Sequence, residues 1–156
     1  MHKVLILIGF LTVTACSGGS SATADAVSDT GLVSCVHDPR VTPYQDGWKA
    51  FSADKSVQVT LLSADPKPPI HGTNHWHVRI SDEKGKDLLD LPVDVSPFMP
   101  DHGHPASVLP TMTTQTDGSW NVEPLELFMA GVWRVTFHVH VGAIVQDVEF
   151  VLCVEG

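Results

Sequence analysis

The sequence predicts an all-β protein. Apolar and polar residues alternate with period two over several segments, which is the pattern of half-buried strands. Turn-forming sequences such as Asp117-Gly118 and Ala130-Gly131 lie between these segments. No stretch has the apolar stripe of an amphipathic helix. Together these observations predict an immunoglobulin-like antiparallel β-sandwich.

Each expected strand follows from its own alternation. Near the amino-terminal side, Val57, Val59 and Leu61 alternate with polar residues. The same period recurs along the chain and predicts strands at 56–62, 74–81, 87–96, 111–116, 119–127, 132–141 and 148–152. In the 132–141 segment the alternating apolar residues are Trp133, Val135, Phe137, Val139 and Val141.

The first residues have the pattern of an export signal. A short positive start and an apolar run, too short to span a bilayer as a helix, predict a signal peptide over residues 1–15. The run ends in Val13-Thr14-Ala15-Cys16, which resembles a bacterial lipobox. In such signals the cysteine is lipidated and becomes the mature amino terminus, which here would be Cys16. The alternative is an ordinary secretory signal with a chance cysteine.

The remaining chain divides into a tether and one domain. Small residues predominate over 16–30, which predicts a flexible linker. Residues 31–156 suffice for a single β-sandwich domain with its own core. The predicted location is extracytoplasmic, lipid-anchored on the periplasmic side of a membrane. Ser17 favours the outer membrane under the usual sorting rule.

Two cysteines remain if Cys16 carries lipid. An even pair outside the cytoplasm is usually a disulfide, so we expect Cys35 to pair with Cys153. Such a bridge closes a loop of over a hundred residues, worth roughly 4–5 kcal/mol in chain-entropy models. The alternative is a cysteine metal site, for which His37 would be the nearest histidine to Cys35.

Composition and motifs exclude several functions. The chain has 9 Lys and Arg against 18 Asp and Glu, a formal net charge of −9, which argues against a nucleic-acid partner. The nucleophile elbow, the His-Glu-x-x-His motif and the phosphate-binding loops are missing from the sequence. We therefore expect that the protein is not an enzyme. A hydrolytic zinc site of three histidines stays open, although only Asp101 adjoins a histidine pair as a candidate base.

Six of the nine histidines form three His-x-His pairs. Residues i and i+2 of a strand share a face, so such a pair can chelate one ion. The pairs His75/His77 and His138/His140 interleave with apolar residues on predicted strands, and they are equally explained as polar surface. If their strands were neighbours, four imidazoles would share one outer face.

The pair His102/His104 has a different context. Pro97, Pro100, Gly103 and Pro105 predict a loop over 97–110 instead of a strand. Met99 lies in the same loop, and thioether sulfur together with imidazole suits soft ions such as Cu(I). Alternatively, Met99 plugs the end of the sandwich.

Simple up-and-down connections would bring several of these segments together. The 97–110 loop, the 128–131 turn with Met129 and the loop with His71 then lie at one end of the sandwich, whereas His138 and His140 lie toward the other. The candidate metal ligands are therefore Met99, His102, His104 and Met129, with His71, His75, His77, His138 and His140 as further candidates.

Three short motifs resemble a known family. They are Met99-Pro100-Asp101-His102-Gly103-His104, Asp117-Gly118-Ser119-Trp120, and the segment from Phe128 to Val135. Residues 56–152 are similar to the YtkA-like/FixH-like group of extracytoplasmic domains. The resemblance implies an immunoglobulin-like sandwich, often membrane-anchored, with some members linked to copper handling or cytochrome oxidase assembly. It carries over Met99, His102, His104 and Met129 as motif positions.

The sequence thus predicts a membrane-anchored lipoprotein that binds a metal ion, with copper as the expected cofactor, and acts as a chaperone or buffer. The expected partners are the membrane, through the lipid, and a copper-handling or oxidase-assembly protein. The alternative is a structural or protein-interaction module that binds no metal.

Overall fold

The computed structural model describes residues 34–156. The predicted signal peptide, Cys16 and the tether lie outside the described residues. The described chain forms nine strands: β1 (Trp48–Phe51), β2 (Val57–Asp65), β3 (Gly72–Asp82), β4 (Val93–Met99), β5 (His104–Pro105), β6 (Thr111–Thr114), β7 (Trp120–Leu127), β8 (Gly131–Val141) and β9 (Ile144–Val154). Within this part of the chain no helix is long and apolar enough to cross a membrane.

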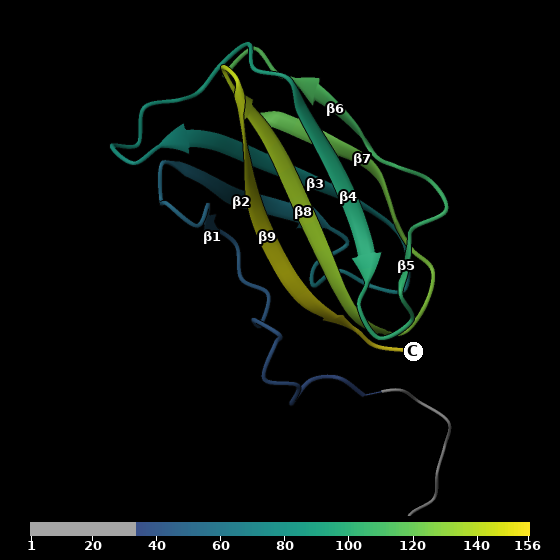
Figure 1. Cartoon of the computed structure of the whole chain (residues 1–156). Coiled ribbons are helices and arrows are strands. Elements are labelled where there is room, and N and C mark those ends of the chain that lie inside the picture. The colour runs from purple at the N-terminus through teal and green to yellow at the C-terminus, as the bar shows by residue number, and fades with distance from the viewer. Residues whose placement is uncertain (1–33) are drawn as a thin grey trace, which may run out of the picture.

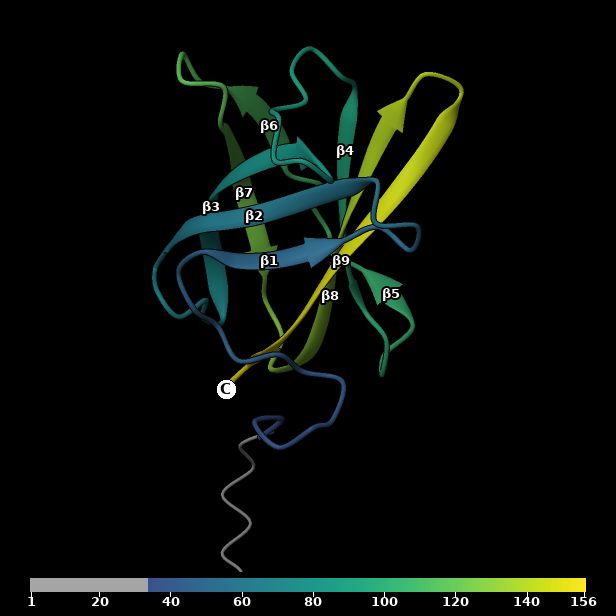
Figure 2. The same ribbon diagram turned by 90° about the vertical axis from the view of Figure 1, so that its left-hand side faces the viewer.

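The strands form two antiparallel sheets that pack face to face (Figure 1). One sheet has the order β1-β2-β3-β7-β6 and the other β5-β4-β8-β9. Figure 2 shows the strands β1 and β2 of the first sheet crossing in front of β8 and β9 of the second. The predicted all-β sandwich of the immunoglobulin-like kind is confirmed.

The core is made by the inward positions of the alternating strands. Phe150 of β9 lies at its centre and makes edge-on contacts with three rings. Its ring centroid is 4.8 Å from that of Trp48, 5.7 Å from that of Trp76 and 5.7 Å from that of Phe137. Both sheets contribute to this cluster, so it joins them at the middle of the sandwich.

The structure corrects the sequence prediction around β4. The strand begins at Val93 instead of residue 87, and it continues through Pro97 to Met99. Proline is tolerated because the Pro97 carbonyl accepts a hydrogen bond from the Ala106 N–H, on the side away from β8. The nitrogen of the same residue faces that side too, so the ladder to β8 loses no donor.

The predicted 97–110 loop begins as a tight hairpin. Met99 pairs with His104 and Phe98 pairs with Pro105, so the short strand β5 contains the proline that was expected to exclude it. The Met99 carbonyl accepts a hydrogen bond from the Gly103 N–H at 2.9 Å. Gly103 has a φ of 68°, a conformation that favours glycine. The hairpin therefore holds both histidines of the middle pair close to the end of β4.

The expected disulfide joins Cys35 and Cys153, which excludes the alternative of a cysteine metal site. It ties an amino-terminal segment to β9. We call residues 34–47 the strap. Its second anchor is the Thr42 N–H, which donates to the Val151 carbonyl at 2.9 Å. The strap then leads into β1, a four-residue strand that the sequence pattern did not predict.

Candidate metal site

The β4–β5 turn and the β7–β8 turn meet at one end of the sandwich, which we call the site end (Figure 1, lower end). β8 starts beside the end of β4, where Phe98 pairs with Arg134. Gly131, with a φ of 136°, opens β8, and a Cβ at this position would lie only 3.0 Å from the Met99 Cε. The predicted meeting of these turns at one end is thus observed.

Met99 is fully buried. Its side chain points between the sheets and closes the core at the site end. This agrees with the alternative interpretation, in which Met99 fills the end of the sandwich. A metal ion bound on the surface of the site end could contact the Met99 sulfur only if the packing of this side chain against Gly131 relaxed.

His102 and His104 are exposed, and their ring centroids lie 5.8 Å apart. The His104 Nδ1–H donates to the Pro105 carbonyl at 2.9 Å, since a carbonyl can only accept. That hydrogen bond places the proton on Nδ1 and leaves the lone pair of Nε2 available for a metal ion.

His104 and Met129 line one small pocket of about 50 Å³. Met129 is 37% exposed, so it is not a core plug. Its carbonyl accepts a hydrogen bond from the Trp133 indole N–H at 2.8 Å, which holds the turn against β8. Glu126 also lines this pocket. The pocket thus collects an imidazole, a thioether and a carboxylate.

His71 reaches the same turn from the β2–β3 loop. Its Nε2–H donates to the Phe128 carbonyl at 2.6 Å. The bond holds the loop at the site end, as the strand directions predicted. This hydrogen bond also occupies the ring nitrogen that faces the turn, so His71 connects the β2–β3 loop to the β7–β8 turn.

The two strand-borne pairs lie on opposite outer faces of the sandwich. His75 and His77 belong to β3 of the five-stranded sheet, whereas His138 and His140 belong to β8 of the other sheet. The prediction that four imidazoles would share one face if their strands were neighbours therefore does not apply.

Each of these four histidines has a polar partner. His75 contacts Glu123, His77 contacts Ser119, His140 contacts Asp94, and His138 contacts both Asp147 and Ser96. Over residues 34–156, no cluster of three or more His, Cys, Asp or Glu side chains is arranged to hold a metal ion. A site at the site end would therefore need methionine sulfur to complete it.

Sequence reasoning missed Arg40. This strap residue donates two hydrogen bonds to Asp101, at 2.6 Å and 2.8 Å, and it also binds Asp38. The hydrogen bonds from Arg40 lower the pKa of Asp101 below its usual range and that of Asp38 to about 2. No sequence signal links Arg40 to a turn 61 residues away.

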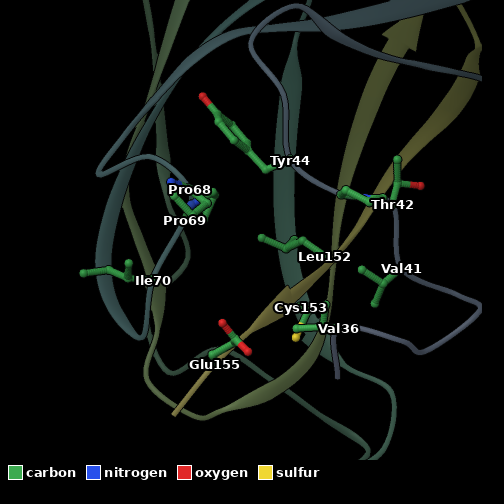
Figure 3. Close-up of a pocket in the computed structure, with 11 residues that line it drawn as sticks. Val36, Val41, Thr42, Tyr44, Pro68, Pro69, Ile70, Leu152, Cys153 and Glu155 are labelled. Carbon is green, nitrogen blue, oxygen red and sulfur yellow. The ribbon is translucent and has the colours of Figure 1, made fainter. Parts of the chain in front are cut away.

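An apolar groove of about 290 Å³ lies between the strap and the loop after β2 (Figure 3). Val36, Tyr44, Ile70 and Leu152 are among its walls. The described residues that line it include neither histidine nor methionine. The groove therefore lacks the donors that a soft metal ion needs.

The fold and this end of the sandwich define an all-β domain with a His/Met candidate site. The YtkA-like family profile matches residues 51–138, more than half of the chain. The chain belongs to the YtkA-like family. The strap, with Arg40, precedes the matched region.

Two solved structures of FetP from uropathogenic Escherichia coli resemble this chain. A copper-bound variant is 13% identical, with a TM-score of 0.47, and the match covers 71% of this chain and 96% of that one. The as-isolated protein is 12% identical, with a TM-score of 0.46, covering 70% and 97%. The comparison with curated proteins finds no match.

Proposed function

We propose that this chain is an extracytoplasmic lipoprotein that binds copper at the site end, as a chaperone or buffer and without enzymatic activity. An extracytoplasmic metal-binding role fits membership of the YtkA-like family. The observation that carries the proposal is the small pocket shared by His104 and Met129, with the ring of His102 beside that of His104.

The donors favour one oxidation state. His102 and His104 would supply imidazole nitrogen, and Met129 would supply thioether sulfur. This mixture suits Cu(I), whereas histidines alone would suit Cu(II) or zinc. Met99 lies directly inside the same end and would join the ligands only through a rearrangement of the core. His71, His75, His77, His138 and His140 do not line the pocket with Met129 and are secondary candidates.

A Cu(I) titration of apo-protein against a competing chelator tests the proposal. We expect His102→Ala/His104→Ala to weaken binding on the order of 100-fold, about 2.7 kcal/mol, because both imidazoles are lost. Met129→Leu, which keeps the volume, should weaken Cu(I) more than Zn(II).

The matched control is His75→Ala/His77→Ala. It removes the same His-x-His pattern from an outer face, and we expect the Cu(I) affinity to stay unchanged. Equal affinities of the wild-type chain and the His102→Ala/His104→Ala variant would refute a copper site at the site end.

A non-metal interaction module is the second candidate. The full burial of Met99 and the apolar groove of Figure 3 favour it. In that case Met129→Leu would leave metal binding as it is in the wild type. The titration above therefore separates the two functions.

Lipid anchoring rests on the residues before Cys16. We expect the full-length chain to sediment with membranes and to incorporate labelled fatty acid, and the Cys16→Ala variant to do neither. Soluble, unlabelled wild-type protein in the periplasmic fraction would contradict anchoring. A partner in copper handling or oxidase assembly belongs to the same proposal.

A further inference from the structure

Arg40 connects the strap to the turn that carries the candidate histidines. Its Nη1 and Nη2 donate to Oδ1 and Oδ2 of Asp101, at 2.6 Å and 2.8 Å. Its Nε and Nη2 also donate to the two carboxylate oxygens of Asp38, at 2.9 Å and 2.7 Å. The guanidinium thus lies between two carboxylates, and both oxygens of Asp101 are engaged.

The strap that carries Arg40 is held independently of this contact. The disulfide of Cys35 anchors it to β9, and the Thr42 N–H anchors it again at Val151. Asp38 fixes the plane of the guanidinium from within the strap. An isolated surface ion pair contributes little to stability. A bidentate arginine within a network, in contrast, is held in one orientation by its partners.

Asp101 directly precedes His102 in the β4–β5 turn. A free carboxylate at this position would be an oxygen donor beside two imidazoles. Oxygen and nitrogen donors together suit Zn(II) and Cu(II), whereas sulfur with nitrogen suits Cu(I). Whether Asp101 is available therefore affects which ion the end of the sandwich prefers.

We infer that Arg40 is a specificity-determining residue: by engaging both oxygens of Asp101 it withholds a second carboxylate, beyond that of Glu126, from the metal and keeps the site selective for Cu(I). The inference rests on the proposed copper site. Arg40 acts through Asp101 and touches no metal ligand itself, so it is a positioning residue. Glu126 stays in the pocket whether or not Arg40 is present, so it does not explain a change in preference.

The test compares Cu(I) and Zn(II) affinities of the full chain and of Arg40→Gln. We expect Arg40→Gln to tighten Zn(II) binding about tenfold, the lower end of the usual effect of residues that orient ligands. The Cu(I) affinity of Arg40→Gln should differ from that of the wild type by less than about threefold. Adding Asp101→Asn to Arg40→Gln should return the Zn(II) affinity to the wild-type value.

Lys67→Gln is the matched control, because it breaks another exposed ion pair, that of Lys67 with Asp46 at 2.8 Å. Arg40→Lys keeps the charge but lacks the planar fork that binds Asp101 and Asp38 together, so we expect part of the change in Zn(II) affinity. Melting temperatures of all variants verify that each is folded.

The outcomes separate the inference from the proposed function. If the wild-type chain binds Cu(I) no better than His102→Ala/His104→Ala, the copper site fails and the inference fails with it. If the wild type binds Cu(I) but Arg40→Gln leaves the Zn(II) to Cu(I) ratio unchanged, only the inference is overturned. An equal loss for both ions, or a gain that Asp101→Asn does not reverse, also overturns it.

Discussion

Replacing both Cys35 and Cys153 with alanine lowers the free energy of unfolding by about 4–5 kcal/mol, because the bridge closes a very long loop in the unfolded chain. The two residues are separated by 118 positions, and their Cα atoms lie 5.4 Å apart in the folded protein. The loss is a large part of the 5–15 kcal/mol by which domains are usually stable. Urea unfolding at constant pH, monitored by tryptophan fluorescence, measures it.

The variant should still fold, because the buried cluster between the sheets is made mainly by residues of the strands, with Tyr44 of the strap packed at its edge. We expect the loss of order to be confined to the strap, with faster hydrogen exchange at the Thr42 amide. Val36→Ala, beside the disulfide but 50% exposed, is the control and should change the stability by no more than about 0.5 kcal/mol. A loss below about 1 kcal/mol in the double variant would contradict the chain-entropy account.

Phe150→Ala is expected to lower the free energy of unfolding by about 3–5 kcal/mol, the usual cost of truncating a buried phenylalanine. Phe150 is fully buried and contacts Trp48, Trp76 and Phe137. No small shift can fill the cavity, because the three rings approach from different strands. Chemical denaturation of the variant, read by circular dichroism, gives the difference.

The matched control is Phe128→Ala, which truncates a phenylalanine that is 50% exposed in the β7–β8 turn. It should cost no more than about 1 kcal/mol, since little buried area is lost. Similar losses for Phe150→Ala and Phe128→Ala would mean that the aromatic cluster does not hold the two sheets together.

Local alternation was enough to predict most strands. The 132–141 segment, for example, became β8 (Gly131–Val141), whose inward residues Trp133, Val135 and Phe137 are almost fully buried. β1 and β5 were missed because four and two residues are too short for a period to be recognised. The predicted strand ended before Pro97, because proline usually breaks a strand. In the structure β4 continues to Met99, since the Pro97 nitrogen faces away from β8 and the ladder to β8 loses no hydrogen-bond donor.

The candidate site was predictable in part. Alternating strand directions placed Met99, Met129, His71 and the pair His102/His104 at one end, and the structure has these segments there. Side-chain direction was not predictable: Met99 turns into the core while Met129 stays at the surface. Whether the two strand-borne histidine pairs share a face could be decided only from the structure, which puts β3 and β8 in different sheets.

The sequence by itself determined the fold class, the disulfide partners and the end of the sandwich where imidazole and thioether groups gather. These follow from local periodicity, from the two cysteines that remain once Cys16 is assigned to the lipobox, and from the alternation of strand direction, none of which needs long-range contacts. The tertiary structure decided that Met99 is buried, that His104 and Met129 share a pocket, and that Arg40 holds Asp101. Each of these depends on contacts between residues far apart in the chain, and such contacts leave no local pattern in the sequence.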